Sequence, residues 1–143
     1  MAQGQAILRF LGNKAGLTRG TPQEKALSEM LLEEEVELHN LLVKANYALD
    51  KAQAYTDLFA TGGAFKTQLA YLEKLHFGES AFFISGEKRC IGGYSLACLL
   101  DIASILEPSL LDDYPKMTLF YNTFMALPEF AGAKDMPMYF SRT

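Results

Sequence analysis

A capping box opens the clearest helical signal in the sequence, at Thr21-Pro22-Gln23-Glu24. The Thr21 hydroxyl can accept from the amide of Glu24, and the Glu24 carboxylate can reach back to the amide of Thr21. Pro22 loses only a donor that is unpaired in the first turn of any helix. Beyond this box, apolar residues recur at the spacing of one buried helical face: Leu27, Met30, Leu31, Leu38, Leu41, Leu42, Ala45, Ala48 and Leu49. We predict one long helix that runs to about Asp50 or beyond.

Other segments carry the same helical period. They are residues 6–12, 65–75, a strongly apolar segment 93–106, and 116–126. The break Thr61-Gly62-Gly63 separates the long helix from the segment 65–75, and Pro108, Pro115 and Pro128 mark further ends and starts. Residues 81–86 read as extended and apolar, but no segment alternates apolar and polar residues over the length of a strand. We predict an all-α fold, a helical bundle in which residues 93–106 form the central buried helix.

Composition excludes several classes of function. The chain has 143 residues, of which 50% are hydrophobic and 21% charged, with a net charge of −4 and no cluster of Lys or Arg. This is typical of one globular domain, and it excludes a nucleic-acid groove. Uncharged stretches stay well short of the roughly 20 residues that a membrane span requires. Because the start also lacks the features of a secretory signal, we expect a cytoplasmic or other reducing location.

The residue types that often carry chemistry are sparse. Cys90 and Cys98 lie too far apart for a C-x-x-C motif and have no further ligand nearby, so we predict free thiols and no metal site. His39 and His76 sit in helical patterns and are assigned no role. The acidic cluster Glu33, Glu34, Glu35 and Glu37 is interpreted as a solvated face of the long helix.

The N-terminal segment is unusual because it is apolar on one face within a dozen residues of Met1. This face comprises Ile7, Leu8, Phe10 and Leu11. A helix at a chain terminus commonly has little to pack against, so another surface must cover these side chains. We predict that they face a partner, either a different protein or a second copy of this chain.

With the helices placed, the sequence resembles the C-terminal domain of cytosolic glutathione transferases of the pi, mu, alpha and sigma-like group. Residues 3–12 resemble the family pattern Q-S-x-A-I-L-R-Y-L-G, and Gly86-Glu87 with residues 99–115 resembles the family's buried helix and its proline exit. The resemblance implies that residues 1–15 are the last helix of a thioredoxin-like domain and that residues 21–143 form the helical domain. It also implies that most of the thioredoxin-like domain, with its thiol-activating residue, lies outside this sequence.

The resemblance also implies site residues. Gln3, Gly4 and Glu37 match positions that bind glutathione in the family, and Tyr47 matches an aromatic residue that borders the hydrophobic substrate pocket. No catalytic residue is assigned, and no cofactor is predicted apart from glutathione as a ligand. Gly4 replaces the family serine, so its hydroxyl contact is lost while its amide can still donate.

A further departure from the family concerns the start of the buried helix. The family's Ser/Thr-x-x-Asp cap is replaced by Cys90 and Gly93. We expect the loss of this cap to cost about 0.5 to 2 kcal/mol, unless another group substitutes.

These observations favour an interaction or structural subunit of an assembly. The alternative is part of a glutathione S-transferase that conjugates glutathione to hydrophobic electrophiles, with its catalytic half on another segment. A carrier of apolar ligands, with a pocket between the long and the buried helix, is a third hypothesis.

Overall fold

The computed structural model describes residues 3–18, 20–75 and 89–131. Its elements are α1 (Gly4–Lys14), α2 (Pro22–Asn46), α3 (Lys51–Phe59), α4 (Ala64–Lys74), α5 (Ile91–Leu106), α6 (Pro115–Met125) and a 3₁₀ turn η1 (Pro128–Phe130). The described ranges contain no strand, which confirms the all-α prediction. None of these helices combines the length and the apolar content needed to cross a membrane.

The capping box forms as predicted. The amide of Glu24 donates to Thr21 Oγ1 over 3.2 Å, and the amide of Thr21 donates to Glu24 Oε2 over 2.7 Å. Two of the amides at this helix start are therefore satisfied by local side chains, which fixes the start of α2 at Pro22.

The predicted end of the long helix is wrong, because α2 stops at Asn46 and a separate helix follows. The Asp50 carboxylate accepts from the amide of Gln53 over 2.9 Å and starts α3. An aspartate at this position competes with helix continuation, and this local signal was not used. Leu49 consequently lies in the corner between the helices and is fully exposed instead of buried.

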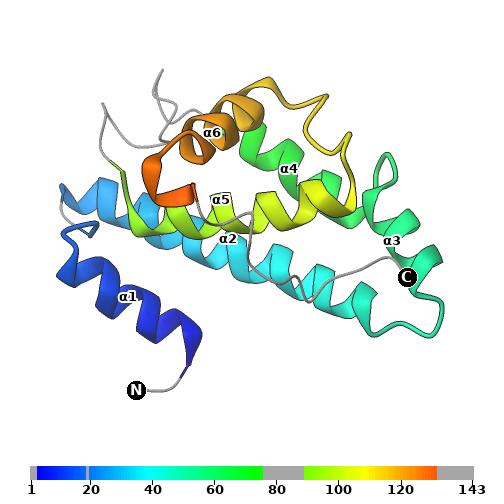
Figure 1. Cartoon of the computed structure of the whole chain (residues 1–143), viewed down its shortest axis with the longest axis horizontal. Coiled ribbons are helices and arrows are strands. Elements are labelled where there is room, and N and C mark those ends of the chain that lie inside the picture. The colour runs from blue at the N-terminus through cyan, green and yellow to red at the C-terminus, as the bar shows by residue number, and fades with distance from the viewer. Residues whose placement is uncertain (1–2, 19, 76–88, 132–143) are drawn as a thin grey trace.

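The core lies between α2 and α5, which run side by side through the centre of the molecule (Figure 1). Helices α4 and α6 lie on one side of this pair, and α1 lies on the other (Figure 1). The α5 residues predicted to be buried are all buried: Leu96, Leu99, Leu100, Ala103 and Leu106. Aromatic side chains extend this core, with Tyr55 stacked on Phe59 and Phe120 tilted against Phe124. The prediction that residues 93–106 form the central helix is confirmed.

The start of α5 is capped after all. Cys90 Sγ accepts from the amide of Gly93 over 3.3 Å, and the Ser28 hydroxyl of α2 accepts from the amide of Gly92 over 3.3 Å. The family's reciprocal cap is absent, and other groups substitute for it, so the expected cost of its loss does not apply in full. A buried thiol and a hydroxyl from the neighbouring helix satisfy two amides of the first turn.

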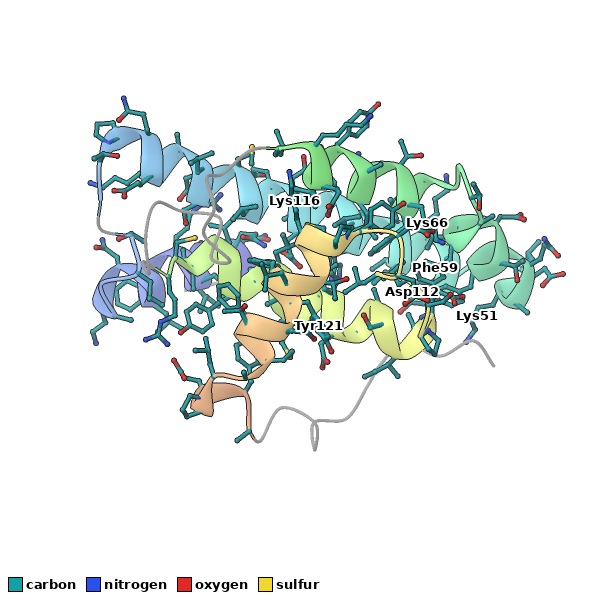
Figure 2. The ribbon with its side chains drawn as sticks, turned by 90° about the horizontal axis from the view of Figure 1, so that it is seen from above. Lys51, Phe59, Lys66, Asp112, Lys116 and Tyr121 are labelled. Carbon is teal, nitrogen blue, oxygen red and sulfur yellow. The ribbon has the colours of Figure 1, made fainter. Side chains whose placement is uncertain are left out.

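The last described elements, α6 and η1, close the bundle. The Glu73 carboxylate of α4 accepts from the amides of Lys116 and Met117 at the start of α6. The Tyr121 hydroxyl donates to Asp101 of α5 over 2.8 Å. Figure 2 shows Lys116 and Tyr121 on α6, where this helix crosses the bundle. His76, the extended segment predicted at 81–86 and the residues after 131 lie outside the described residues.

Candidate functional site

Helix α1 is the element least integrated into the bundle. Gly12 is its only buried residue, and none of its side chains belongs to the apolar core cluster. Figure 1 shows α1 lying alongside the N-terminal halves of α2 and α5. The contact with α5 is close at Gly12, where an added β-carbon would lie 2.8 Å from the β-carbon of Ile91. The helix is therefore docked on the bundle without being part of its core.

The side chains that α1 turns toward α2 are polar. Gln5 Nε2 donates to Glu35 Oε2 over 2.7 Å. The Arg9 guanidinium donates to Glu29 through Nε over 2.8 Å and to Glu33 through Nη2 over 2.6 Å. Glu29 and Glu33 lie four residues apart on one face of α2, so the single guanidinium of Arg9 reaches both, while Gln5 binds Glu35 further along.

The apolar side chains of α1 point away from the bundle. Ile7 is 38% exposed, Phe10 48% and Leu11 51%, whereas Leu8 is half-buried. The Lys14 ammonium lies 5.8 Å from the centre of the Phe10 ring. Helix α1 therefore has the opposite orientation to a normal surface helix, whose apolar stripe faces the core. We call Ile7, Phe10 and Leu11 the α1 face.

The residues assigned to glutathione by resemblance lie at two places. Gln3 is the exposed residue before α1, with φ of 74°, and Gly4 is the exposed first residue of the helix. Glu37 is exposed on α2 and accepts from Gln68 Nε2 over 3.2 Å. Gln5 near the start of α1 contacts Glu35, whereas Glu37 contacts α4, which lies on the other side of the central pair from α1 (Figure 1), so Glu37 and the start of α1 have different neighbours.

Tyr47 lies apart from the three glutathione positions. It is 82% exposed and follows the last residue of α2, about 15 Å along the helix axis from Glu37 at 1.5 Å per residue. The roles of Gln3, Gly4, Glu37 and Tyr47 remain predictions.

The acidic cluster of α2 is not uniformly solvated, contrary to our interpretation. The Glu35 side chain is only 13% exposed, and burial raises its pKa against the opposing effects of His39 and of hydrogen bonds from Gln5 and Ser95. Glu34 is half-buried, and desolvation followed by the charge of Glu37 raises its pKa. Glu35 thus lies where α2 is covered by α1 and α5, since its partners Gln5 and Ser95 come from those two helices.

The thiols and several phenols of the described residues are held in their neutral forms. Burial raises the pKa of the Cys90 thiol, and desolvation together with Asp101 and Glu35 raises that of Cys98. Both cysteines are free, as predicted. Desolvation is also the main cause of the raised pKa values of three tyrosines, namely Tyr94, Tyr114 and Tyr121. These shifts oppose the formation of a thiolate or phenolate nucleophile.

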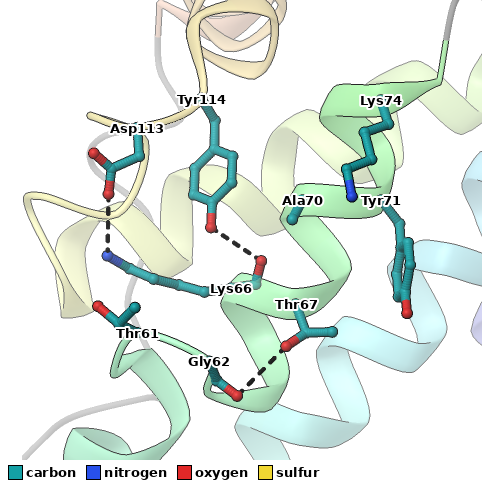
Figure 3. Close-up of a pocket in the computed structure, with 9 residues that line it drawn as sticks. All are labelled: Thr61, Gly62, Lys66, Thr67, Ala70, Tyr71, Lys74, Asp113 and Tyr114. Atoms are coloured by element: carbon teal, nitrogen blue, oxygen red, sulfur yellow. Dashed lines mark hydrogen bonds and ion pairs between the residues drawn. The ribbon is translucent and has the colours of Figure 1, made fainter.

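An open cavity of about 260 Å³ borders α4 (Figure 3). Lys66 Nζ lies 3.8 Å from Asp113 Oδ2, and the Tyr114 hydroxyl donates to the Lys66 carbonyl over 3.0 Å. The remaining lining residues are Thr61, Gly62, Thr67, Ala70, Tyr71 and Lys74. A second cavity of about 280 Å³ lies among α2, α3 and α4. Neither cavity includes a predicted site residue or lies between α2 and α5, where the carrier hypothesis expects a pocket. Within the described ranges, no group of three His, Cys, Asp or Glu residues could hold a metal ion.

The sequence is similar to curated glutathione S-transferases of the P and Mu types. It is 29% identical over 143 residues to glutathione S-transferase P of Bos taurus, covering 98% of this chain and 66% of that protein. It is 27% identical over 136 residues to glutathione S-transferase Mu 4 of Mus musculus, covering 89% of this chain and 56% of that protein. The chain is a homologue of pi- and mu-class glutathione transferases. No protein-family model matches it.

Solved structures show the same fold for this glutathione transferase homologue. The pi-class glutathione S-transferase of Onchocerca volvulus superposes with a TM-score of 0.83 at 24% identity, over 94% of this chain and 64% of that one. Rat hPGDS complexed with a quinoline superposes with a TM-score of 0.80 at 22% identity, over 96% of this chain and 69% of that one. The homologue spans between 56% and 66% of the length of the curated relatives that it matches. It has the helical fold of the C-terminal transferase domain.

Proposed function

We propose that this transferase homologue acts as an interaction subunit, a helical domain whose α1 face is covered by another folded surface. The orientation of α1 supports this proposal. Gln5 and Arg9 bond to α2, whereas Ile7, Phe10 and Leu11 point outward. A helix that presents its apolar stripe to solvent indicates an interaction site.

The energy available at this face is substantial for one helix. A fully buried large apolar side chain contributes about 1.5 to 3 kcal/mol. The three residues of the α1 face are between 38% and 51% exposed. Covering them would therefore contribute on the order of 2 to 4 kcal/mol. This contribution favours contact with a partner at the α1 face, but it is smaller than the free energy that a complete interface must supply.

The occupant that we propose is a thioredoxin-like segment that presents the apolar face of its sheet. The resemblance to the family supports this choice, because there the corresponding helix packs on such a sheet. The relatives are also longer than this chain. In the assembly that we propose, the thiol-activating group comes from that segment, while this domain contributes the bundle. The raised pKa values of Cys90, Cys98 and Tyr121 support a non-catalytic role for the described residues.

Light scattering and a binding assay on the purified chain test the proposal. A thioredoxin-like domain from a pi-class transferase, added as a separate chain, should bind the wild type. Phe10→Glu and Leu11→Glu should weaken this binding strongly, because each would bury a charge in the contact. Leu119→Glu is the matched control, since Leu119 is 55% exposed on α6, away from α1. Association of the chain with itself, blocked by the same two variants, would identify a second copy as the occupant. A monomer that binds nothing would contradict the proposal.

A glutathione-binding role is the second candidate, in which the domain forms part of a glutathione-conjugating enzyme. One observation favours it: the start of α1 has no side-chain cap, so amides of its first turn are available to the carboxylate of a ligand. Calorimetry with glutathione tests this candidate, and Gly4→Pro, which removes the amide at residue 4, should abolish binding. Glutathione binding without conjugation activity would support a ligand site on a non-catalytic domain.

A further inference from the structure

The contacts that hold α1 on α2 consist of charged and polar groups. Arg9 bonds to Glu29 and Glu33, and these two hydrogen bonds are the main cause of its raised pKa. The three side chains are partly exposed, at 36%, 49% and 66% respectively. Ion pairs with this exposure are weakened by salt, so the attachment of α1 depends on ionic strength.

A second contact between α1 and α2 involves a buried carboxylate. Gln5 Nε2 donates to Glu35 Oε2 over 2.7 Å, and the Glu35 side chain is only 13% exposed. The other groups that face Glu35 are His39 of α2, whose Nδ1 is 3.8 Å away, and Ser95 and Cys98 of α5. Burial raises the pKa of Glu35, whereas the hydrogen bond from Gln5 lowers it, so the α1 contact favours the charged carboxylate and helps to hold the helix in place.

The C-terminal end of α1 is anchored by Gly12 against Ile91, whereas its N-terminal part is held by the contacts of Gln5 and Arg9. The connector to α2 contains Gly16 and Gly20, both with positive φ. The amide of Ile91 donates to the Leu17 carbonyl over 3.2 Å, which fixes the connector rather than the helix. A helix of 11 residues is marginal in water without packing, so an undocked α1 would fray and its amides would exchange with solvent.

We propose that α1 docks on the bundle through a reversible, charge-controlled clasp, in which Arg9 holds the helix on Glu29 and Glu33 and Gln5 holds it on Glu35. The attraction of Arg9 for its two carboxylates falls as the salt concentration rises. The clasp is a property of this chain alone, and it rests on the proposed function only in that it would control how the α1 face meets its occupant.

Hydrogen exchange of the α1 amides in the full chain tests the clasp, with the α5 amides as the reference for global unfolding. Arg9→Gln should speed α1 exchange about two- to tenfold at low salt and remove its salt dependence. Lys14→Gln, a charge change on the same helix outside the clasp, should keep the salt dependence. Gln5→Ala, which removes the donor to Glu35, should also speed α1 exchange, and it should keep the salt dependence that Arg9 sets.

Three results would overturn the clasp. They are an Arg9→Gln chain that keeps the wild-type salt dependence, a Gln5→Ala chain whose α1 amides exchange at the wild-type rate, and equal acceleration of α1 and α5, which indicates global unfolding. These measurements use the chain alone, so their failure is distinct from a failure to bind a thioredoxin-like domain.

Discussion

The amide of Gly92 donates to the hydroxyl of Ser28 over 3.3 Å, and at this contact α5 packs closely on α2. A β-carbon added to Gly92 would overlap the Ser28 carbonyl oxygen and lie 2.9 Å from the β-carbon of Leu31. The obstacle is backbone from the opposite helix, which cannot rotate away. The packing of the two central helices therefore requires glycine at this position.

Gly92→Ala should destabilise the protein by about 1 to 3 kcal/mol or more, because α5 must move away from α2 to admit the methyl group. Urea unfolding followed by far-ultraviolet circular dichroism measures the loss. Gly4→Ala is the matched control, since a β-carbon there meets no atom within 4 Å. Equal stability of Gly92→Ala and the wild type would show that α2 and α5 do not pack this closely.

Replacing the capping thiol tests the start of α5. Cys90→Ala removes the acceptor of the Gly93 amide and should cost about 0.5 to 2 kcal/mol. Cys90→Ser keeps an acceptor and should stay closer to the wild type, although it places a hydroxyl at a position that is only 3% exposed. If both variants lose the same stability, the effect comes from packing of the sulfur and the cap contributes nothing.

Much of the fold could be predicted because its signals are local. The capping box fixed the start of α2, and the apolar period of residues 93–106 identified the central helix. The division between α2 and α3 was missed because the apolar spacing continues to Leu49, while the decisive interaction is one hydrogen bond between Asp50 and Gln53. The close contact at Gly92 depends on two helices far apart in sequence, which periodicity does not reveal.

The site was only partly accessible from sequence. The apolar residues of α1 were recognised, but their outward orientation depends on Arg9 and Gln5 finding carboxylates on α2. The spacing of Glu29 and Glu33, four residues apart on one helix face, indicates a site for one cation, but it does not say which cation occupies it. The burial of Glu35 could not be read from the acidic run, because burial depends on which helices cover that face.

The bond between Tyr121 and Asp101 predicts an alkaline loss of stability. Desolvation and the Asp101 carboxylate raise the pKa of Tyr121 from 10.0 to about 12. For a phenol with a raised pKa, the stabilisation is complete below the unfolded value and is lost as the pH rises through the folded value. Tyr121→Phe should cost about 1 kcal/mol at neutral pH and remove this loss between about pH 10 and 12. The difference in tyrosinate absorbance between the wild type and Tyr121→Phe, followed against pH, measures the titration of the Tyr121 phenol. A Tyr121 phenol that titrates near pH 10 would contradict the bond to Asp101.

Glu34 should destabilise the protein at neutral pH. Its Oε2 is buried without a hydrogen-bond partner among the described residues, and desolvation followed by the Glu37 charge raises its pKa. For a carboxyl group with a raised pKa, the stabilising effect is present at low pH and is lost as the pH rises through the folded value, because the charge must then be accommodated. Glu34→Gln should therefore raise the free energy of unfolding by a few tenths to about 1 kcal/mol at pH 7, and the gain should vanish near pH 4.

Urea unfolding of Glu34→Gln at the two pH values gives the measurement, with Glu33→Gln as the matched control. The control removes an exposed carboxylate that pairs with Arg9, so it should leave stability unchanged or lower it slightly. If Glu34→Gln instead destabilises at pH 7, the carboxylate has a favourable partner when ionised. In that case the folded protein would favour the charged form of Glu34, contrary to its raised pKa. Glu35, which accepts a hydrogen bond from Gln5, would then be the only one of these two acids whose charged form is disfavoured by burial.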